Sequence, residues 1–220
     1  MPFISLREIV DVIIMTVVVG IIFSDAFKGY FHLKRKQIDV TDPEYYRVNY
    51  GLWNRIGVDK EAIRLAIIVT APAVVLHELA HKFVAIAFGI AATFKASYFG
   101  LMLGLVLKVV FPGFVFFIPG YVEISSIIEP LKHAVIAFAG PGMNLILWLG
   151  SAYLLKKNQS KTNTNHQAKI NPKVINLKGK WLLILHMTKR INMFLFILNM
   201  LPIPIFDGFK VYEGIIRTFF

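Results

Sequence analysis

Hydrophobic residues gather in long runs along this chain. Three of these runs are Ile9–Phe27, Leu65–Ile90 and Ala134–Leu155. Each is long enough to form a helix across the hydrocarbon core of a bilayer, which takes about 20 apolar residues. A fourth run, Ile191–Phe206, is shorter and continues past Asp207. The pattern predicts a mainly α-helical membrane protein with about four transmembrane helices.

Two polar stretches separate some of these runs. Lys28–Lys60 follows the first run, and Lys156–Lys180, with seven lysines and no acidic residue, follows the third. Both stretches are typical of solvated loops.

The segment Ala91–Ser125 departs from the helical pattern. Ala92–Tyr98 and Phe114–Ile118 are rich in aromatic and β-branched residues and are bounded by glycine or proline, which favours two strands. Gly100–Val110, between them, would be an apolar connector that dips into the membrane. We therefore expect a membrane-associated β-hairpin or re-entrant segment between the second and third helices. The alternative is that Gly100–Ile118 forms another transmembrane helix.

Composition supports a membrane protein. Hydrophobic residues make up 56% of the chain and charged residues 17%, and the mean hydropathy is +0.63. The net charge of +11 is carried mostly by the segments between apolar runs, so it favours contact with anionic lipid headgroups over nucleic acid. No cysteine is present, so any metal must be bound by histidine, aspartate or glutamate.

The second apolar run contains the sequence His77-Glu78-Leu79-Ala80-His81. Ionisable residues in a transmembrane helix are costly, and they indicate a functional site. On a helix the two histidines share a face, where both can bind one metal ion, whereas Glu78 points away and could activate water. This arrangement predicts zinc-assisted hydrolysis within a membrane, although so short a pattern can also arise by chance.

A catalytic zinc site usually has three protein ligands. Between residues 62 and 212 the chain has only four carboxylates, which are Glu78, Glu123, Glu129 and Asp207. Asp207 ends an apolar run that two prolines break, and the freed backbone groups there need a polar cavity. We therefore favour Asp207 as the third ligand, and we expect Glu123 and Glu129 to be solvated surface charges. The remaining histidines lack ligand spacing; they are His32, His133, His166 and His186.

Four motifs occur in one order between residues 65 and 208. They are His77-Glu78-Leu79-Ala80-His81, Pro119-Gly120-Tyr121-Val122, Ala139-Gly140-Pro141-Gly142-Met143-Asn144 and Asn199-x-x-Pro202-x-x-x-x-Asp207-Gly208. Together they resemble the site-2 protease family of intramembrane zinc metalloproteases.

The resemblance implies a role for each motif. It implies that His77, His81 and Asp207 bind zinc, with Glu78 as the general base. Asn199 would lie near the metal and assist the substrate carbonyl. Substrate binding would involve Gly120, Tyr121 and Val122, which belong to an edge strand that captures extended substrate, and also Asn144.

On this interpretation, the protein is an intramembrane zinc metalloprotease that cleaves other membrane proteins in or near their transmembrane segments. We expect one polytopic domain over residues 1–220, with a core at 65–208, no PDZ or CBS module, and a location in the cell membrane. Two alternatives remain open. The chain could be a metal-binding transporter or channel, or a membrane protease like those that process prenylated proteins, although the latter use a second glutamate as a ligand.

Overall fold

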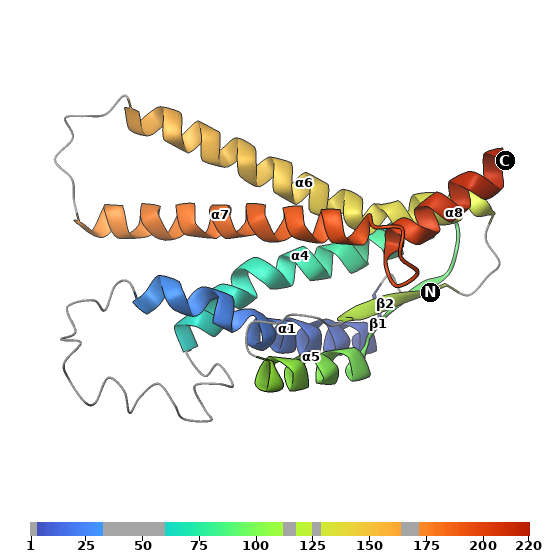
Figure 1. The fold of residues 1–220 in the computed structure, drawn as a ribbon, viewed down its shortest axis with the longest axis horizontal. Coiled ribbons are helices and arrows are strands. Elements are labelled where there is room, and N and C mark those ends of the chain that lie inside the picture. The colour runs from blue at the N-terminus through green and yellow to red at the C-terminus, as the bar shows by residue number, and fades with distance from the viewer. Residues whose placement is uncertain (1–3, 33–59, 112–117, 125–128, 164–171) are drawn as a thin grey trace. The chain divides into compact units, whose positions relative to one another are not determined.

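The computed structural model describes residues 4–32, 60–111, 118–124, 129–163 and 172–220. In this part of the chain the helices are α1 (Leu6–His32), α4 (Lys60–Ala87), α5 (Tyr98–Val110), α6 (Pro130–Asn163), α7 (Pro172–Asn199) and α8 (Asp207–Phe219). Two short strands, β1 (Ala92–Ala96) and β2 (Gly120–Ile124), form an antiparallel hairpin (Figure 1). The mainly helical fold with a small hairpin between helices is therefore as predicted.

Four of the described helices contain stretches long and apolar enough to cross a membrane. These stretches are Leu6–Phe27 in α1, Ala62–Ala87 in α4, Pro130–Asn158 in α6 and Gly179–Asn199 in α7. The first three confirm the predicted spans, with small shifts at their ends. A proline lies inside both α4 and α6, yet neither helix ends there.

The fourth span begins and ends earlier than predicted. The sequence pattern placed it at Ile191–Phe206, whereas the apolar part of α7 is Gly179–Asn199 and residues 200–206 form turns. Lys189 and Arg190 interrupt the hydrophobic pattern inside α7, but they do not interrupt the helical backbone. Pro202, which lacks a backbone N–H, lies in the turns beyond the end of the helix.

Helices also extend into the predicted loops. α6 continues to Asn163 and α7 begins at Pro172, so Lys156–Lys180 is helical except at residues 164–171, which lie outside the described residues. Lysine, glutamine and leucine are good helix formers even where they are solvated. The other predicted loop, Lys28–Lys60, lies outside the described residues from 33 to 59.

The segment Ala91–Ser125 contains the expected strands, but the second is shifted. β1 confirms the first predicted strand, whereas the second strand is Gly120–Ile124; most of Phe114–Ile118 lies outside the described residues. The expected connector between the strands contains the helix α5 (Tyr98–Val110), which the sequence pattern did not suggest. Its 13 residues rise only about 20 Å, too short to cross a hydrocarbon core of about 30 Å.

The chain divides into two compact units. The first comprises Met1–Val75 and Thr93–Glu123, and the second comprises Leu76–Ala92 and Ile124–Phe220. Helix α4 contributes residues to both units.

In the first unit, α5 lies beside α1 and polar groups join the two helices at both ends (Figure 1). Near the start of α5, the Tyr98 hydroxyl donates to Asp11 Oδ1. Near its end, Lys108 Nζ lies 2.9 Å from Asp25 Oδ2 and donates to Ser24 Oγ at 2.9 Å. Lys108 is buried, so α5 is fixed along α1 by a charged contact inside an apolar environment.

The hairpin is attached to α1 through the outer edge of β1. Glu8 Oε1 accepts a hydrogen bond from the Phe94 N–H at 2.8 Å, and Asp11 Oδ2 accepts one from the Ala96 N–H at 3.2 Å. On the other edge of β1, the Ser97 N–H donates to Pro119 O, next to the start of β2. Two buried carboxylates of α1 thus occupy the edge of β1 that faces away from β2.

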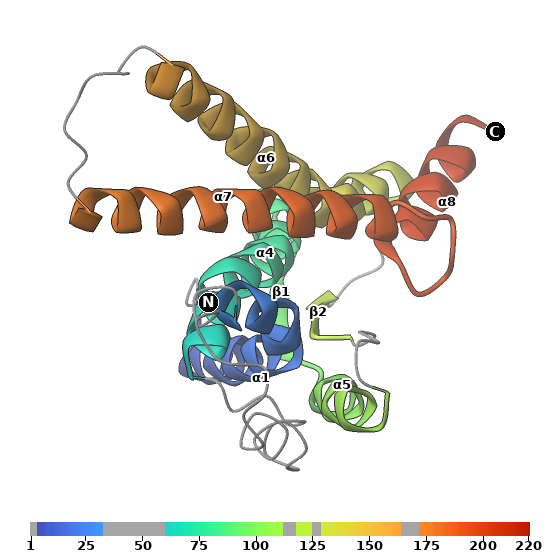
Figure 2. The same cartoon turned by 60° about the vertical axis from the view of Figure 1, so that its left-hand side comes forward.

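The second unit is built on α6, which packs against both α7 and α8. α6 and α7 approach each other near the C-terminal end of α7, and they diverge toward the C-terminal end of α6 and the N-terminal end of α7 (Figures 1 and 2). α8 lies along the N-terminal part of α6 (Figures 1 and 2). Gly214 of α8 allows this close approach, because a Cβ there would fall within 3.0 Å of Pro130 O and the Ala134 side chain.

Lys108→Met should destabilise the first unit. Removing the ammonium group takes the buried Lys108 charge away from the Asp25 carboxylate, and because Asp25 is partly exposed we expect a loss of about 2 kcal/mol. Thermal or denaturant unfolding in detergent would measure it. Lys95→Met is the matched control, because the Lys95–Glu123 pair is largely exposed and its loss should change stability little. Equal effects of the two substitutions would contradict a structural role for the buried pair.

Candidate metal centre

Two histidines lie on one face of α4, in the part of this helix that belongs to the second unit. His77 and His81 are four residues apart, so the helix places them one above the other, and both are buried. Their rings meet edge to face with centroids 4.8 Å apart, and the two Nε2 atoms are separated by 3.2 Å. The sequence prediction that the two histidines share one face is confirmed.

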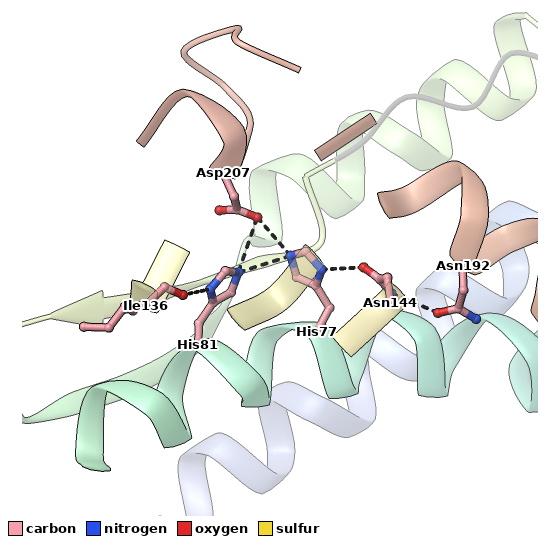
Figure 3. Close-up of polar contacts among 6 residues, drawn as sticks. All are labelled: His77, His81, Ile136, Asn144, Asn192 and Asp207. Carbon is pink, nitrogen blue, oxygen red and sulfur yellow. Dashed lines mark hydrogen bonds and ion pairs between the residues drawn. The ribbon is translucent and has the colours of Figure 1, made fainter. Parts of the chain in front are cut away.

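Asp207 meets the two imidazoles from a distant part of the chain. It is the first residue of α8, and its Oδ2 lies 3.1 Å from His77 Nε2 and 3.3 Å from His81 Nε2 (Figure 3). Among the described residues, these three side chains are the one group of histidine and acidic residues whose ligand atoms all lie within 4.8 Å of one another.

The turns between α7 and α8 bring Asp207 to this position. They are closed by short backbone hydrogen bonds, including Phe206 N–H to Ile203 O at 2.9 Å. Gly208 then passes directly against the backbone of Met200 and Leu201, where a Cβ would fall within 3.0 Å of backbone atoms. Only glycine fits directly after Asp207, because the chain folds back closely against the backbone of Met200 and Leu201.

Each imidazole is oriented by a partner on its other nitrogen. His81 Nδ1 lies 2.7 Å from the Ile136 carbonyl oxygen, and His77 Nδ1 lies 2.6 Å from Asn144 Oδ1 (Figure 3). Both partners belong to α6. Such outer contacts of a histidine fix the ring and direct its remaining nitrogen toward a metal.

Gly140 lets α6 approach the histidines closely enough for these contacts. A Cβ at this position would fall within 3.0 Å of the imidazole nitrogens of both His77 and His81. No side chain larger than hydrogen fits between α6 and the two rings without displacing them.

The donor set fits a zinc ion. Ligand atoms arranged tetrahedrally at about 2.0 to 2.2 Å from zinc lie roughly 3.3 Å from one another, close to the three separations seen here. The Ile136 carbonyl can only accept a hydrogen bond, so a neutral His81 must carry its proton on Nδ1 and present a lone pair at Nε2. That lone pair faces a carboxylate and a second imidazole, and a metal ion or a proton between these groups would stabilise the arrangement.

Asp207 is held as an anion in this setting. Burial acts to raise the pKa of Asp207, but without a metal the histidines can carry protons on Nε2, and their hydrogen bonds and charge then outweigh burial and hold this pKa well below its ordinary value. An ionised carboxylate is the form that binds a metal ion.

Residues 65–220 match the family described as Peptidase family M50. This chain belongs to that family. It is also 35% identical over 153 residues to a protein of Methanocaldococcus jannaschii named "Putative zinc metalloprotease", an alignment that covers 68% of this chain and 69% of the relative. No solved structure matches the chain significantly. The family, the relative and the apolar helices together describe a multi-pass membrane zinc protease.

The other predicted site residues of this M50 peptidase occupy different positions. Glu78 is buried on α4 next to His77, and Asn199 is the last residue of α7. The two carboxylates that we expected to be surface charges pair with lysines: Glu123 with Lys95 and Glu129 with Lys132. Gly120, Tyr121 and Val122 lie on β2, in the first unit.

Asn144 has contacts that the sequence did not suggest. We predicted that it binds substrate, and this stays a prediction. Its side chain is fully buried, with Oδ1 at His77 Nδ1 and Nδ2 donating to Asn192 Oδ1 at 2.9 Å. These contacts favour a role in orienting the histidine.

Sequence reasoning missed Asn192 and the carbonyl of Ile136. A backbone carbonyl carries no sequence signal. An asparagine inside an apolar helix does carry one, because a polar side chain in a transmembrane segment usually has a polar partner, and that signal could have identified Asn192.

Gly140→Ala in this M50 peptidase should weaken zinc binding by at least about tenfold, the size of effect expected when ligand orientation is disturbed. Its methyl group would push α6 away from the two imidazoles. Zinc content and affinity of the purified protein would measure the effect. Gly150→Ala is the matched control, since the same helix has open space there and alanine is the better helix former. Parental zinc affinity in Gly140→Ala would show that the close approach of α6 is unnecessary.

Proposed function

We propose that this protein hydrolyses peptide bonds in or beside transmembrane segments of other membrane proteins. In this proposal His77, His81 and Asp207 are the zinc ligands, Glu78 is the general base, and Asn199 assists the substrate carbonyl. The catalytic core extends over residues 65–208, and the protein acts in the cell membrane.

The observation that carries the proposal is the convergence of three ligand atoms beside an apolar helix. His77 Nε2, His81 Nε2 and Asp207 Oδ2 lie 3.1 to 3.3 Å from one another, and Glu78 is buried on the same helix without belonging to this group. A site that only bound or transported a metal would need no separate buried carboxylate, so Glu78 favours catalysis over transport.

The division of roles follows from the chemistry of each group. Bound by this donor set, zinc supplies a Lewis acid that polarises a carbonyl and lowers the pKa of water toward about 7. Glu78 accepts a proton from the attacking water and later delivers it to the leaving amine as the peptide bond breaks. The amide of Asn199 can donate a hydrogen bond to the carbonyl oxygen as negative charge develops there.

The outer edge of β2 is the proposed site of substrate capture. A transmembrane helix must unwind before its peptide bonds can be cut, and adding an extended strand to a sheet supplies replacement backbone hydrogen bonds with little demand on sequence. β1 is not available for this, because Glu8 and Asp11 occupy its outer edge. Since Pro119 O faces β1, antiparallel alternation turns the Val122 N–H toward the opposite edge.

Glu78→Gln and Asp207→Ala should separate catalysis from metal binding. Glu78→Gln keeps all three proposed ligands, so zinc should stay close to stoichiometric while cleavage is lost, because an amide cannot accept the proton of water. Asp207→Ala removes one ligand of three and should lose zinc and activity together. Zinc analysis and cleavage of a detergent-solubilised transmembrane peptide would be measured on the same preparations.

The outcomes discriminate between the proposals. Robust cleavage by Glu78→Gln would remove the proposed base. Zinc binding that survives in Asp207→Ala would return the search for a third ligand to other carboxylates. A parent protein that binds zinc but cleaves no peptide would favour the transporter alternative.

Val122→Pro should reduce cleavage while zinc content is kept. Proline removes the N–H that we expect to pair with substrate, and it cannot join a strand ladder. Val122→Ala keeps the N–H and is the matched control, so its cleavage rate should stay near that of the parent. If both variants cleave equally well, the β2 edge does not pair with substrate.

A further inference from the structure

We infer that Asn192 on α7 is a positioning residue that sets the tautomer of His77 and thereby directs its Nε2 toward the metal. The inference rests on the proposed ligand set. It concerns a residue that touches neither metal nor substrate, and that acts through Asn144 (Figure 3).

The direction of the hydrogen bonds is fixed by a backbone carbonyl. Asn192 lies 2.8 Å from the Thr188 carbonyl oxygen, which can only accept, so the atom of Asn192 at this contact must be its Nδ2. The other side-chain atom of Asn192 is then its oxygen. This oxygen can only accept, and so the adjacent atom of Asn144 must be its NH2 group, at 2.9 Å.

The same reasoning continues to the metal ligand. With its NH2 group directed to Asn192, Asn144 presents its oxygen to His77 Nδ1 at 2.6 Å. An oxygen acceptor there requires the imidazole proton to be on Nδ1. A neutral His77 therefore presents a lone pair at Nε2, the atom that lies 3.1 Å from Asp207.

The two histidines are thus controlled in different ways. His81 donates to a backbone carbonyl, whose polarity cannot change. His77 faces a side-chain amide, which could rotate by half a turn and present its NH2 group instead. That rotation would leave the proton of a neutral imidazole on Nε2 and would block metal binding. Asn192 prevents the rotation, since its oxygen would then face the oxygen of Asn144.

Burial makes this control strict. Asn144 and Asn192 are both fully buried, at 0% relative exposure, so solvent water is not available to satisfy an amide in the wrong orientation. A misdirected amide here would place two acceptors against each other in an apolar region, where unsatisfied polar groups are most costly. Helix α7 is coupled in this way, through α6, to a ligand on α4.

Three substitutions of Asn192 test the inference. Asn192→Leu has similar volume but no acceptor, so the Asn144 amide loses the group that selects its orientation, and zinc affinity should fall by about tenfold. Asn192→Ala should have the same effect, and it provides the test if the leucine variant does not fold. Asn192→Asp, as the protonated acid, donates to the Thr188 carbonyl and keeps an oxygen that accepts from Asn144, so it should bind zinc nearly as tightly as the parent.

The measurements are the zinc dissociation constant, by competition with a chelator of known affinity, and the thermal unfolding of the metal-free protein. Leu185→Ala is the packing control, because Leu185 is buried on α7 two turns before Asn192. It should lower thermal stability and keep zinc affinity. The absorption spectrum of the cobalt-substituted protein should change in Asn192→Leu and remain parental in Asn192→Asp.

Two results would overturn the inference: parental zinc affinity in both Asn192→Leu and Asn192→Ala, or an equal loss in Asn192→Asp and Asn192→Leu, which would mean that Asn192 only supports packing. His77→Ala distinguishes this failure from failure of the proposed ligand set. If His77→Ala binds zinc like the parent, the ligand assignment is wrong. If it loses zinc while every Asn192 variant keeps it, the ligand set stands and only the role of Asn192 is rejected.

Discussion

Three electron-pair donors face one another in the second unit, and the surrounding structure depends on this constraint. Two imidazole nitrogens and a carboxylate oxygen at 3.1 to 3.3 Å would repel without a cation among them. Keeping the nitrogens unprotonated requires a hydrogen-bond acceptor behind each ring. α6 supplies both acceptors, so it must pass very close to α4, and this is possible only with glycine at position 140.

The position of the third proposed ligand, Asp207, depends on the turn between α7 and α8. Asp207 is far from the histidines in sequence and reaches them because the chain turns sharply after α7. Pro202 and Pro204 keep the helix from continuing, and Gly208 permits contact with the backbone of the preceding turn. The carboxylate is then held at the beginning of a helix, where the dipole favours negative charge. Its position is therefore set by the backbone of the turn as well as by the imidazoles.

The sequence predicted the site residues that stand out by ligand spacing or by the small number of candidate carboxylates. His77 and His81 have helical ligand spacing, and Asp207 was one of only four carboxylates in the relevant stretch. Asn192 was missed because its role comes from tertiary contact between helices. The ends of the fourth span were misplaced for a related reason: Lys189 and Arg190 break a hydrophobic pattern, but they cost the helix none of its backbone hydrogen bonds.

The hairpin of the first unit must satisfy a different requirement, which is the pairing of backbone groups at its strand edges. Strand edges in an apolar environment leave backbone N–H and C=O groups that must find partners. α1 supplies carboxylates to two N–H groups on the outer edge of β1, and α1 also contacts α5 through Asp11 and Asp25. Among the described residues no third strand pairs with β2. The acids of α1 thus make the hairpin asymmetric, because they pair with the outer edge of β1 while no described strand pairs with the outer edge of β2.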